Sequence, residues 1–410
     1  METTREERFK KNIIRVSSRI LEQLNDKTDL DKEMRYFFGI LKDTFVDFES
    51  NENRYIGSYC VMVPDEIIYA YGYIPVRLCA GNSVAAMIGD EIAPRDACPV
   101  LKASYGFSQM SVLPIYNQCE AVVLPMTCDG KRKSAEILSE HVPVIPLFVP
   151  MGKSDEDFEQ MLKSMKSLTK TLSEFTEKKL SNKLLVKAYK DIYEAQKQAF
   201  RLSEIFSQKN TPLRGSEFMA VMNSFCYTKP LEWAKKVEEL CNALSSVPTK
   251  TTDKRRKKTR VLIAGSPITF PNYKIPLLLE EMGAQIVGDE TCMSGRMLYD
   301  PVIPDDYSTE SMLRAFTARY VSACSCPVFD QLDDQIYRLT EKIKNSKAEG
   351  VVYYVLRGCT PYDFELSKAE EAAEKMGIPL IRVETDFSLE DQEQVKIRLE
   401  AFVEMLEQRR

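Results

Sequence analysis

The stretch that indicates the fold lies at residues 121–133 and reads A-V-V-L-P-M-T-C-D-G-K-R-K. Its apolar start is typical of a buried strand, which we expect to break at Pro125. Cys128, Asp129 and Gly130 then precede a group of cations. A strand followed by a glycine turn is a common start for a nucleotide site, but such sites use glycines with a lysine or a hydroxyl and need no thiol. The thiol is therefore a buried packing group, a nucleophile or one ligand of several.

The chain is long enough for two or three domains, because 410 residues exceed what one ordinary core holds. Apolar residues at helical spacing predict amphipathic helices over 1–50 and an all-helical segment within 153–258, which ends in a basic linker. Short apolar strands alternate with helices in 51–152 and again in 259–410. The sequence therefore predicts an α/β protein with two parallel-sheet lobes, a helical N-terminal segment and a helical bridge.

The strands of the two lobes are short and mostly apolar. We predict them at 75–78, 121–124, 144–148, 260–265, 285–288, 350–356 and 380–383. In an open parallel sheet, ligands bind beyond the carboxyl ends of the strands. The residues just after each strand are therefore the candidate site residues.

The charge and the termini exclude several classes of function. The formal net charge of -5 argues against nucleic acid as the main partner, and the one basic run, K-R-R-K-K at 254–258, fits a solvated linker better than a docking patch. The start M-E-T-T-R-E-E-R-F-K-K has no signal-peptide core, and no run of about 18 apolar residues occurs, so we expect a cytoplasmic protein without a membrane span. In that compartment the 11 cysteines are not expected to form disulfides.

Many of the cysteines occur just after predicted strands, several stand beside Pro or Gly, and each lobe offers three candidates. They are Cys60, Cys98, Cys128, Cys292, Cys326 and Cys359. A neighbouring Pro or Gly interrupts regular backbone hydrogen bonding and leaves N–H groups free to point at a thiolate or a sulfide. Cysteine is also a small hydrophobic residue, so we expect the others to be packing groups, namely Cys79, Cys119, Cys226 and Cys241.

Most other thiol chemistries are disfavoured. Zinc prefers C-x-x-C pairs or histidines, whereas the chain has no C-x-x-C and a single histidine, His141, which also argues against a cysteine-histidine hydrolase. The sequences G-x-S-x-G and G-x-G-x-x-G and a Walker loop are missing. Scattered thiolates suit an iron-sulfur cluster, whose sulfide core accepts cysteines from separate loops, although their spacing alone does not decide it.

Seven motifs occur in an order that is similar to a known family. They are Y-C-V-M-V-P-D-E-I-I-Y-A-Y-G-Y-I-P-V-R-L, R-D-A-C-P-V-L-K-A-S-Y-G-F, C-D-G-K-R-K, C-M-S-G-R, C-S-C-P, G-C-T-P-Y-D and I-P-L-I-R-V-E-T-D. From about residue 55 to the C-terminus, the chain resembles the 2-hydroxyacyl-CoA dehydratase and benzoyl-CoA reductase family, and within it the double-cubane cluster branch. Carried over residue by residue, the resemblance makes the same six cysteines the cluster ligands, with Cys324 competing with Cys326.

The resemblance implies two flavodoxin-like lobes with an oxygen-sensitive iron-sulfur cluster between them. In the double-cubane branch this is an 8Fe cluster held by six thiolates in a homodimer that reduces small molecules, whereas dehydratases hold one 4Fe-4S cluster. Electrons come from a separate ATP-hydrolysing activator with its own 4Fe-4S cluster. Leu113 stands where similar double-cubane sequences tend to have a cysteine, so that position cannot supply a ligand here.

We therefore predict an anaerobic-type iron-sulfur reductase component that acts on a small molecule. The alternatives are a 2-hydroxyacyl-CoA dehydratase subunit, which would need a partner of similar fold, and a non-catalytic carrier of iron-sulfur units. Asp129 and Arg357 flank two of the cysteines, so we predict that they move protons or screen charge. Lys131, Arg132 and Lys133 are candidate contacts for an acidic activator surface or a CoA phosphate. No motif identifies the substrate.

Overall fold

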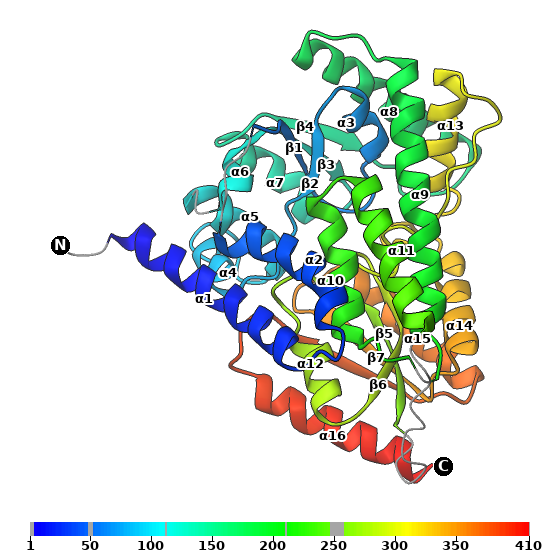
Figure 1. Cartoon of the computed structure of the whole chain (residues 1–410). Helices are drawn as coiled ribbons and strands as arrows, with labels where there is room; N and C mark the ends of the chain where they lie inside the picture. Colours follow the sequence, from blue (N-terminus) through cyan, green and yellow to red (C-terminus); the bar gives the residue numbers. More distant parts are fainter. Residues whose placement is uncertain (1–3, 48–51, 111–112, 210, 247–257, 410) are drawn as a thin grey trace.

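The computed structural model describes residues 4–47, 52–110, 113–209, 211–246 and 258–409. In this part of the chain, two four-stranded parallel sheets lie among helices, one in each half of the sequence (Figure 1). The predicted α/β fold with two parallel-sheet lobes is confirmed. The boundaries predicted for the four segments stay predictions, and most of the basic run 254–258 lies outside the described residues.

The sheet of the first lobe has the strand order β2-β1-β3-β4. Its strands are β1 (Tyr55–Ser58), β2 (Ile74–Arg77), β3 (Cys119–Met126) and β4 (Val144–Phe148). Its helices are α3 (Asp65–Ala70), α4 (Ser83–Gly89), α5 (Pro99–Met110), α6 (Pro114–Asn117) and α7 (Asp129–Ser139). The sequence pattern does not predict β1, because this strand has only 4 residues and contains Gly57, whose missing side chain lets Leu78 and Val122 pack against the backbone.

The predicted break at Pro125 is wrong, because β3 continues through this residue to Met126. The Tyr59 N–H donates to the Val123 carbonyl, which places the peptide groups of Val123 on the β1 side of β3. Peptide groups alternate sides along a strand, so those of Pro125 also face the β1 side. By that point β1 has ended, at Ser58, and this ladder does not need an N–H from Pro125.

The sheet of the second lobe repeats the same order, β6-β5-β7-β8. Its strands are β5 (Arg260–Gly265), β6 (Gln285–Thr291), β7 (Gly350–Leu356) and β8 (Leu380–Thr385). Its helices are α12 (Lys274–Glu281), α13 (Thr309–Tyr320), α14 (Asp333–Ser346), α15 (Thr360–Lys375) and α16 (Gln392–Gln408). The equal order gives each strand of one lobe a counterpart in the other, so that β7 corresponds to β3.

Helices form both the bridge between the two lobes and the N-terminal segment of the chain. The helices of the predicted bridge are α8 (Asp155–Thr176), α9 (Asn182–Phe206), α10 (Gly215–Ser224), the short helix η2 (Phe225–Tyr227) and α11 (Pro230–Ser246). Those of the N-terminal segment are α1 (Arg5–Asp26), α2 (Asp31–Lys42) and η1 (Asp43–Asp47). The bridge contacts both lobes, since Tyr71 donates to the Thr169 carbonyl on α8 and Asn223 on α10 donates to the Met293 carbonyl. Within the described ranges, no helix has both the length and the apolar character that a membrane crossing requires.

Segments that follow strands of the two lobes contact each other. The Gly81 N–H, after β2, donates to the Phe270 carbonyl, after β5, at 3.0 Å. Helix α13 of the second lobe also packs against the first, where Arg319 pairs with the buried Glu66 at 3.3 Å. These contacts bring the carboxyl ends of both sheets to one region between the lobes, where the predicted cysteines also lie.

Candidate metal centre

Three of the predicted cysteines lie at the N-termini of helices. Cys98 directly precedes α5, and Cys128 and Cys359 are the N-cap residues of α7 and α15. We call these three residues the cap triad. A helix N-terminus carries partial positive charge and N–H groups without an intrahelical acceptor, and both features stabilise a thiolate. The residues after these cysteines favour a helix start, since Pro99 opens α5 and the acidic Asp129 opens α7.

A glycine turn brings cap-triad residues of both lobes together. Gly358 has a φ of +77°, and a Cβ at this position would lie 2.3 Å from the Asp96 carbonyl oxygen, so glycine is required. The turn places Cys359 beside the segment that carries Cys98. The Cys359 thiol hydrogen-bonds to the Cys98 sulfur and lowers the pKa of Cys98, whereas burial and the charge of Cys128 oppose that shift. The lobes therefore meet at sulfur atoms.

The other three predicted cysteines, Cys60, Cys292 and Cys326, lie on loops, and we call them the loop triad. Cys60 follows β1 with a φ of 75°, which is rare for a residue with a side chain and indicates a backbone held in place by its surroundings. Cys292 directly follows β6. The loop of Cys326 is fixed by Lys153 after β4, which donates to the Cys324 carbonyl at 2.7 Å.

The loop triad also combines residues of both lobes. Burial raises the pKa of Cys326, and the charges of Cys292, Cys324 and Cys60 raise it further, so each of these three thiols is near enough to interact with Cys326. A cavity of about 30 Å³ adjoins them and is lined by thiol and guanidinium side chains, including Cys292, Cys324, Cys326, Arg296, Arg319 and Arg338. Cys324 and Cys326 both line this cavity, so the choice between them as a ligand stays open.

One lysine interacts with both triads. Lys131, in the first turn of α7, is partly buried and forms no ion pair with a carboxylate within the described residues. Burial disfavours its charge, but neighbouring thiolates outweigh burial and raise the pKa of Lys131; they belong to Cys60, Cys128, Cys79 and Cys326. An uncompensated cation in a buried place is unfavourable. This lysine therefore fits a region that holds negative charge.

The four cysteines predicted to be packing groups are all buried. The Cys119 thiol donates to the Ile115 carbonyl at 3.1 Å, and the Cys226 thiol contacts the Met297 sulfur at 3.3 Å. Cys79 differs from them, because Lys131 and Cys60 both influence its pKa, which burial raises. Cys79 therefore borders the candidate site, which its position in the sequence does not indicate.

The donor set fits a cluster better than a single ion. Within the described residues, no three Cys, His, Asp or Glu side chains are grouped closely enough to hold one metal ion. In a cluster each cysteine binds its own iron, so the sulfurs stand further apart. Backbone N–H groups also act on the sulfurs, those of Val100 and Leu101 on Cys98 and that of Val328 on Cys326. Six soft thiols beside a cation fit an anionic, thiolate-bound iron-sulfur cluster.

The sequence profile described as 2-hydroxyglutaryl-CoA dehydratase, D-component, matches residues 60–406, a span that contains all six predicted cysteines. The chain belongs to the 2-hydroxyglutaryl-CoA dehydratase D-component family. It is 28% identical to YjiM of Escherichia coli (strain K12), over 88% of this chain and 94% of the relative. It is 23% identical to the (R)-phenyllactyl-CoA dehydratase beta subunit of Clostridium sporogenes (87% and 93%) and 20% identical to one subunit of the benzoyl-CoA reductase of Thauera aromatica (81% and 86%). The family predicted from the seven motifs is confirmed.

In this D-component family member, the two residues predicted to be catalytic lie at the surface. The Asp129 side chain is fully exposed and pairs with Arg132 at 3.8 Å. Arg357 is exposed and pairs with Asp386 at 2.7 Å. Both positions are typical of surface ion pairs, and the catalytic role of these residues stays a prediction. Of the three cations after Cys128, only Lys131 is partly buried, while Arg132 and Lys133 are exposed.

Two further site residues of this D-component chain were not predicted. The Tyr362 hydroxyl lies 2.6 Å from the Cys292 sulfur, and Arg296 donates to the Tyr362 oxygen at 3.1 Å. Both residues occur in motifs that support the family resemblance, G-C-T-P-Y-D and C-M-S-G-R. The motifs thus contained both residues, but no local sequence pattern indicates that they interact with each other and with the Cys292 sulfur.

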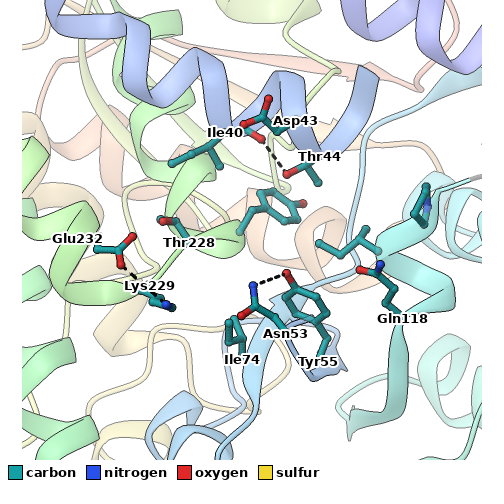
Figure 2. A pocket seen from close by; sticks show the side chains of 13 residues that line it. Ile40, Asp43, Thr44, Asn53, Tyr55, Ile74, Gln118, Thr228, Lys229 and Glu232 are labelled. Atoms are coloured by element: carbon teal, nitrogen blue, oxygen red, sulfur yellow. Dashed lines mark hydrogen bonds and ion pairs between the residues drawn. The ribbon is translucent and has the colours of Figure 1, made fainter. Parts of the chain in front are cut away.

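A larger cavity of about 280 Å³ lies at the opposite end of the first sheet (Figure 2). It is lined by Tyr55 and Ile74, the first residues of β1 and β2, and by Lys229 and Glu232 from the region where α11 begins. The Asn53 amide donates to the Tyr55 hydroxyl at 3.3 Å on its wall. No cysteine is among the described residues that line it, so this cavity is separate from both triads.

Proposed function

We propose that the chain is a reductase component with a double-cubane type iron-sulfur cluster, which receives low-potential electrons from an ATP-hydrolysing activator and reduces small molecules. The observation that carries this proposal is the grouping of six thiols into two triads, each with members from both lobes. Each triad would supply three protein sulfurs to one 4Fe-4S half of an 8Fe cluster. The names of two relatives, a CoA dehydratase and a CoA reductase, support this type of chemistry.

The residues of the chain have distinct roles in this proposal. The helix N-termini place partial positive charge at the cap-triad sulfurs. Lys131 compensates negative charge at both triads. Arg296 and Tyr362 act on the sulfur of Cys292. When bound, the cluster would supply single electrons at low potential, because thiolates and sulfides concentrate negative charge.

We infer an external electron donor from the same charge argument. A low-potential cluster needs an energy source, and the sequence has no Walker loop or dinucleotide fingerprint. We therefore expect an activator protein that hydrolyses ATP and carries its own 4Fe-4S cluster, together with a homodimer of this chain. The exposed Arg132 and Lys133, four and five residues after Cys128, are candidate contacts for an acidic activator surface.

A dehydratase subunit with one 4Fe-4S cluster is the second candidate. The cap triad favours it, because this triad brings three thiols together without the loop triad. The match to the beta subunit of a dehydratase over 93% of its length points the same way. In that case the chain would act with a partner subunit on an acyl-CoA, and the loop triad would hold no iron.

Iron and acid-labile sulfide counted in anaerobically purified protein test the proposal. About eight irons per chain support the double cubane, about four support the dehydratase subunit, and substoichiometric iron that transfers to another protein supports a carrier. The chain alone should not hydrolyse ATP, and reduction should start when the activator and MgATP are added. ATP hydrolysis by the chain alone, or full turnover with NADH and no partner, contradicts the proposal.

A further inference from the structure

Tyr362 acts on both triads. It lies in the first turn of α15, three residues after Cys359, and its side chain is 5% exposed. Its hydroxyl oxygen lies 2.6 Å from the Cys292 sulfur, within hydrogen-bond distance. Its backbone N–H acts on the Cys359 sulfur, whose pKa it lowers against the larger opposing effects of Cys98 and burial. One residue therefore interacts with a cap-triad sulfur through its backbone N–H and with a loop-triad sulfur through its side-chain hydroxyl.

Arg296 sets the direction of the Tyr362 hydrogen bond. A guanidinium group has only N–H donors, so the Tyr362 oxygen must accept at the 3.1 Å contact with Arg296 Nη1. The hydroxyl proton is then free to point at the Cys292 sulfur. Arg296 is held in place, because its Nε donates to Glu290 at 2.8 Å and its Nη2 lies 3.7 Å from Glu365. All of these side chains are buried, so water does not compete for the contacts.

We propose that Tyr362 is a positioning residue that donates a hydrogen bond to the Cys292 sulfur and thereby raises the reduction potential of the cluster, with Arg296 fixing the direction of the proton. This inference rests on the proposed iron-sulfur function. A hydrogen bond to a ligating thiolate withdraws negative charge from it, which favours the reduced cluster with its additional electron. Tyr362→Phe removes only the hydroxyl and leaves the N–H at Cys359.

A matched control exists on the same cavity. Tyr320 lines the cavity together with Cys292 and Cys326, and it is 5% exposed, as Tyr362 is. Its hydroxyl donates to the Val63 carbonyl at 3.1 Å and not to a sulfur. Tyr320→Phe therefore removes a buried hydroxyl from the same region without removing a hydrogen bond to a candidate ligand.

The test compares wild type, Tyr362→Phe and Tyr320→Phe as full-length, anaerobically loaded proteins. Iron is counted, the midpoint potential is measured by redox titration monitored by electron paramagnetic resonance, and iron-thiolate covalency is measured by sulfur K-edge absorption. We expect equal iron in all three, and a shift to more negative potential in Tyr362→Phe alone, by about 59 mV for a tenfold change in a one-electron equilibrium. The covalency should rise in the same variant only.

A second substitution keeps the inference testable if Tyr362→Phe fails to fold. Tyr362→3-fluorotyrosine keeps the shape of the ring and makes the hydroxyl a stronger donor, so the potential should shift in the positive direction. Loaded proteins with equal midpoint potentials in wild type, Tyr362→Phe and Tyr362→3-fluorotyrosine overturn the inference alone. Wild-type protein that binds no iron overturns the proposed function, and this inference with it.

Discussion

The two triads differ in what surrounds their sulfurs. The cap-triad cysteines Cys98, Cys128 and Cys359 stand at the starts of three helices, where backbone dipoles stabilise negative charge. The loop triad has no such helices, and at its Cys292 sulfur a side chain acts instead, the Tyr362 hydroxyl to which Arg296 donates. The surroundings of the cap triad therefore depend mainly on backbone groups, which single substitutions leave in place, whereas those of the Cys292 sulfur depend on side chains, which substitutions remove.

Equivalent sequences give unequal structures in the two lobes. Both lobes contain a Cys-Pro dipeptide, Cys98-Pro99 in the first and Cys326-Pro327 in the second. The first opens α5 directly, whereas the next helix after Cys326, α14, begins only at Asp333. In between, the Asp330 N–H donates to the Met151 carbonyl of the first lobe at 2.9 Å. Docking between the lobes thus replaces the helix start in the second lobe.

The largest effect should come from breaking the cap triad. We expect Cys128→Ala to lose the iron held by that triad and to lower stability in the loaded protein, because binding of a cluster is coupled to folding of the loops that carry its ligands. Iron analysis and visible absorption measure the loss. Cys226→Ala, in η2 of the bridge, is the control and should keep the wild-type iron content. Full iron in Cys128→Ala would make this thiol a packing group.

Removal of Arg296 should destabilise the loop triad strongly. Arg296→Met leaves the buried carboxylates of Glu290 and Glu365 with less positive charge, and breaking a buried pair costs about 3–5 kcal/mol. Urea unfolding of the iron-free protein measures this loss. Arg132→Met, at an exposed pair near the cap triad, should cost under about 1 kcal/mol. Equal losses in the two variants would contradict the contrast between the triads.

Glu365 should make the stability depend on pH. Burial raises its pKa from 4.5 to about 7, against the opposing effect of Arg296. The folded state therefore favours the protonated carboxyl, and this contribution is full below the unfolded pKa and is lost as the pH rises through about 7. Glu365→Gln should reduce the fall in the free energy of unfolding between pH 4.5 and 7 by up to about 3 kcal/mol. The same pH dependence in wild type and variant would show that Glu365 titrates normally.

Lys131 offers a comparison within one helix. Lys131→Met removes a cation that interacts with sulfurs of both triads, and should make the midpoint potential of the loaded protein more negative. Loss of about 1 kcal/mol of electrostatic stabilisation of the reduced cluster corresponds to a shift of about 40 mV for one electron. Lys133→Met, on the exposed side of α7, should leave the potential unchanged. An equal shift in both variants would mean that the overall charge of the chain, and not the buried position, sets the effect.

The smallest effect should come from Asp129. Its side chain is fully exposed, so Asp129→Asn should leave the unfolding curve and the iron content at wild-type values. Activity with the activator tests its predicted catalytic role. A loss of about 100-fold in turnover at unchanged iron content would support that role, since general acid-base groups contribute on the order of 10²–10⁴.

The sequence determined the strands of the second lobe well. The predicted strands at 260–265 and 350–356 have the bounds of β5 and β7, because uninterrupted, fully buried runs are typical of central parallel strands. It missed β1, which has only 4 residues. It placed Cys128, Cys292 and Cys359 just after predicted strands, and in a parallel sheet that position leads to one edge. The family was also evident from the motifs alone.

Only the tertiary structure decided how the six cysteines divide into two triads. The partners of each triad lie in different lobes and far apart in the chain, and their meeting depends on contacts such as Arg319 with Glu66, 253 residues apart. The turn at Gly358 against Asp96 and the contact of Tyr362 with Cys292 depend on docking in the same way. Local patterns record the periodicity of a helix or strand, whereas these contacts depend on the complementary shapes of two separately folded surfaces, which no short stretch of sequence contains.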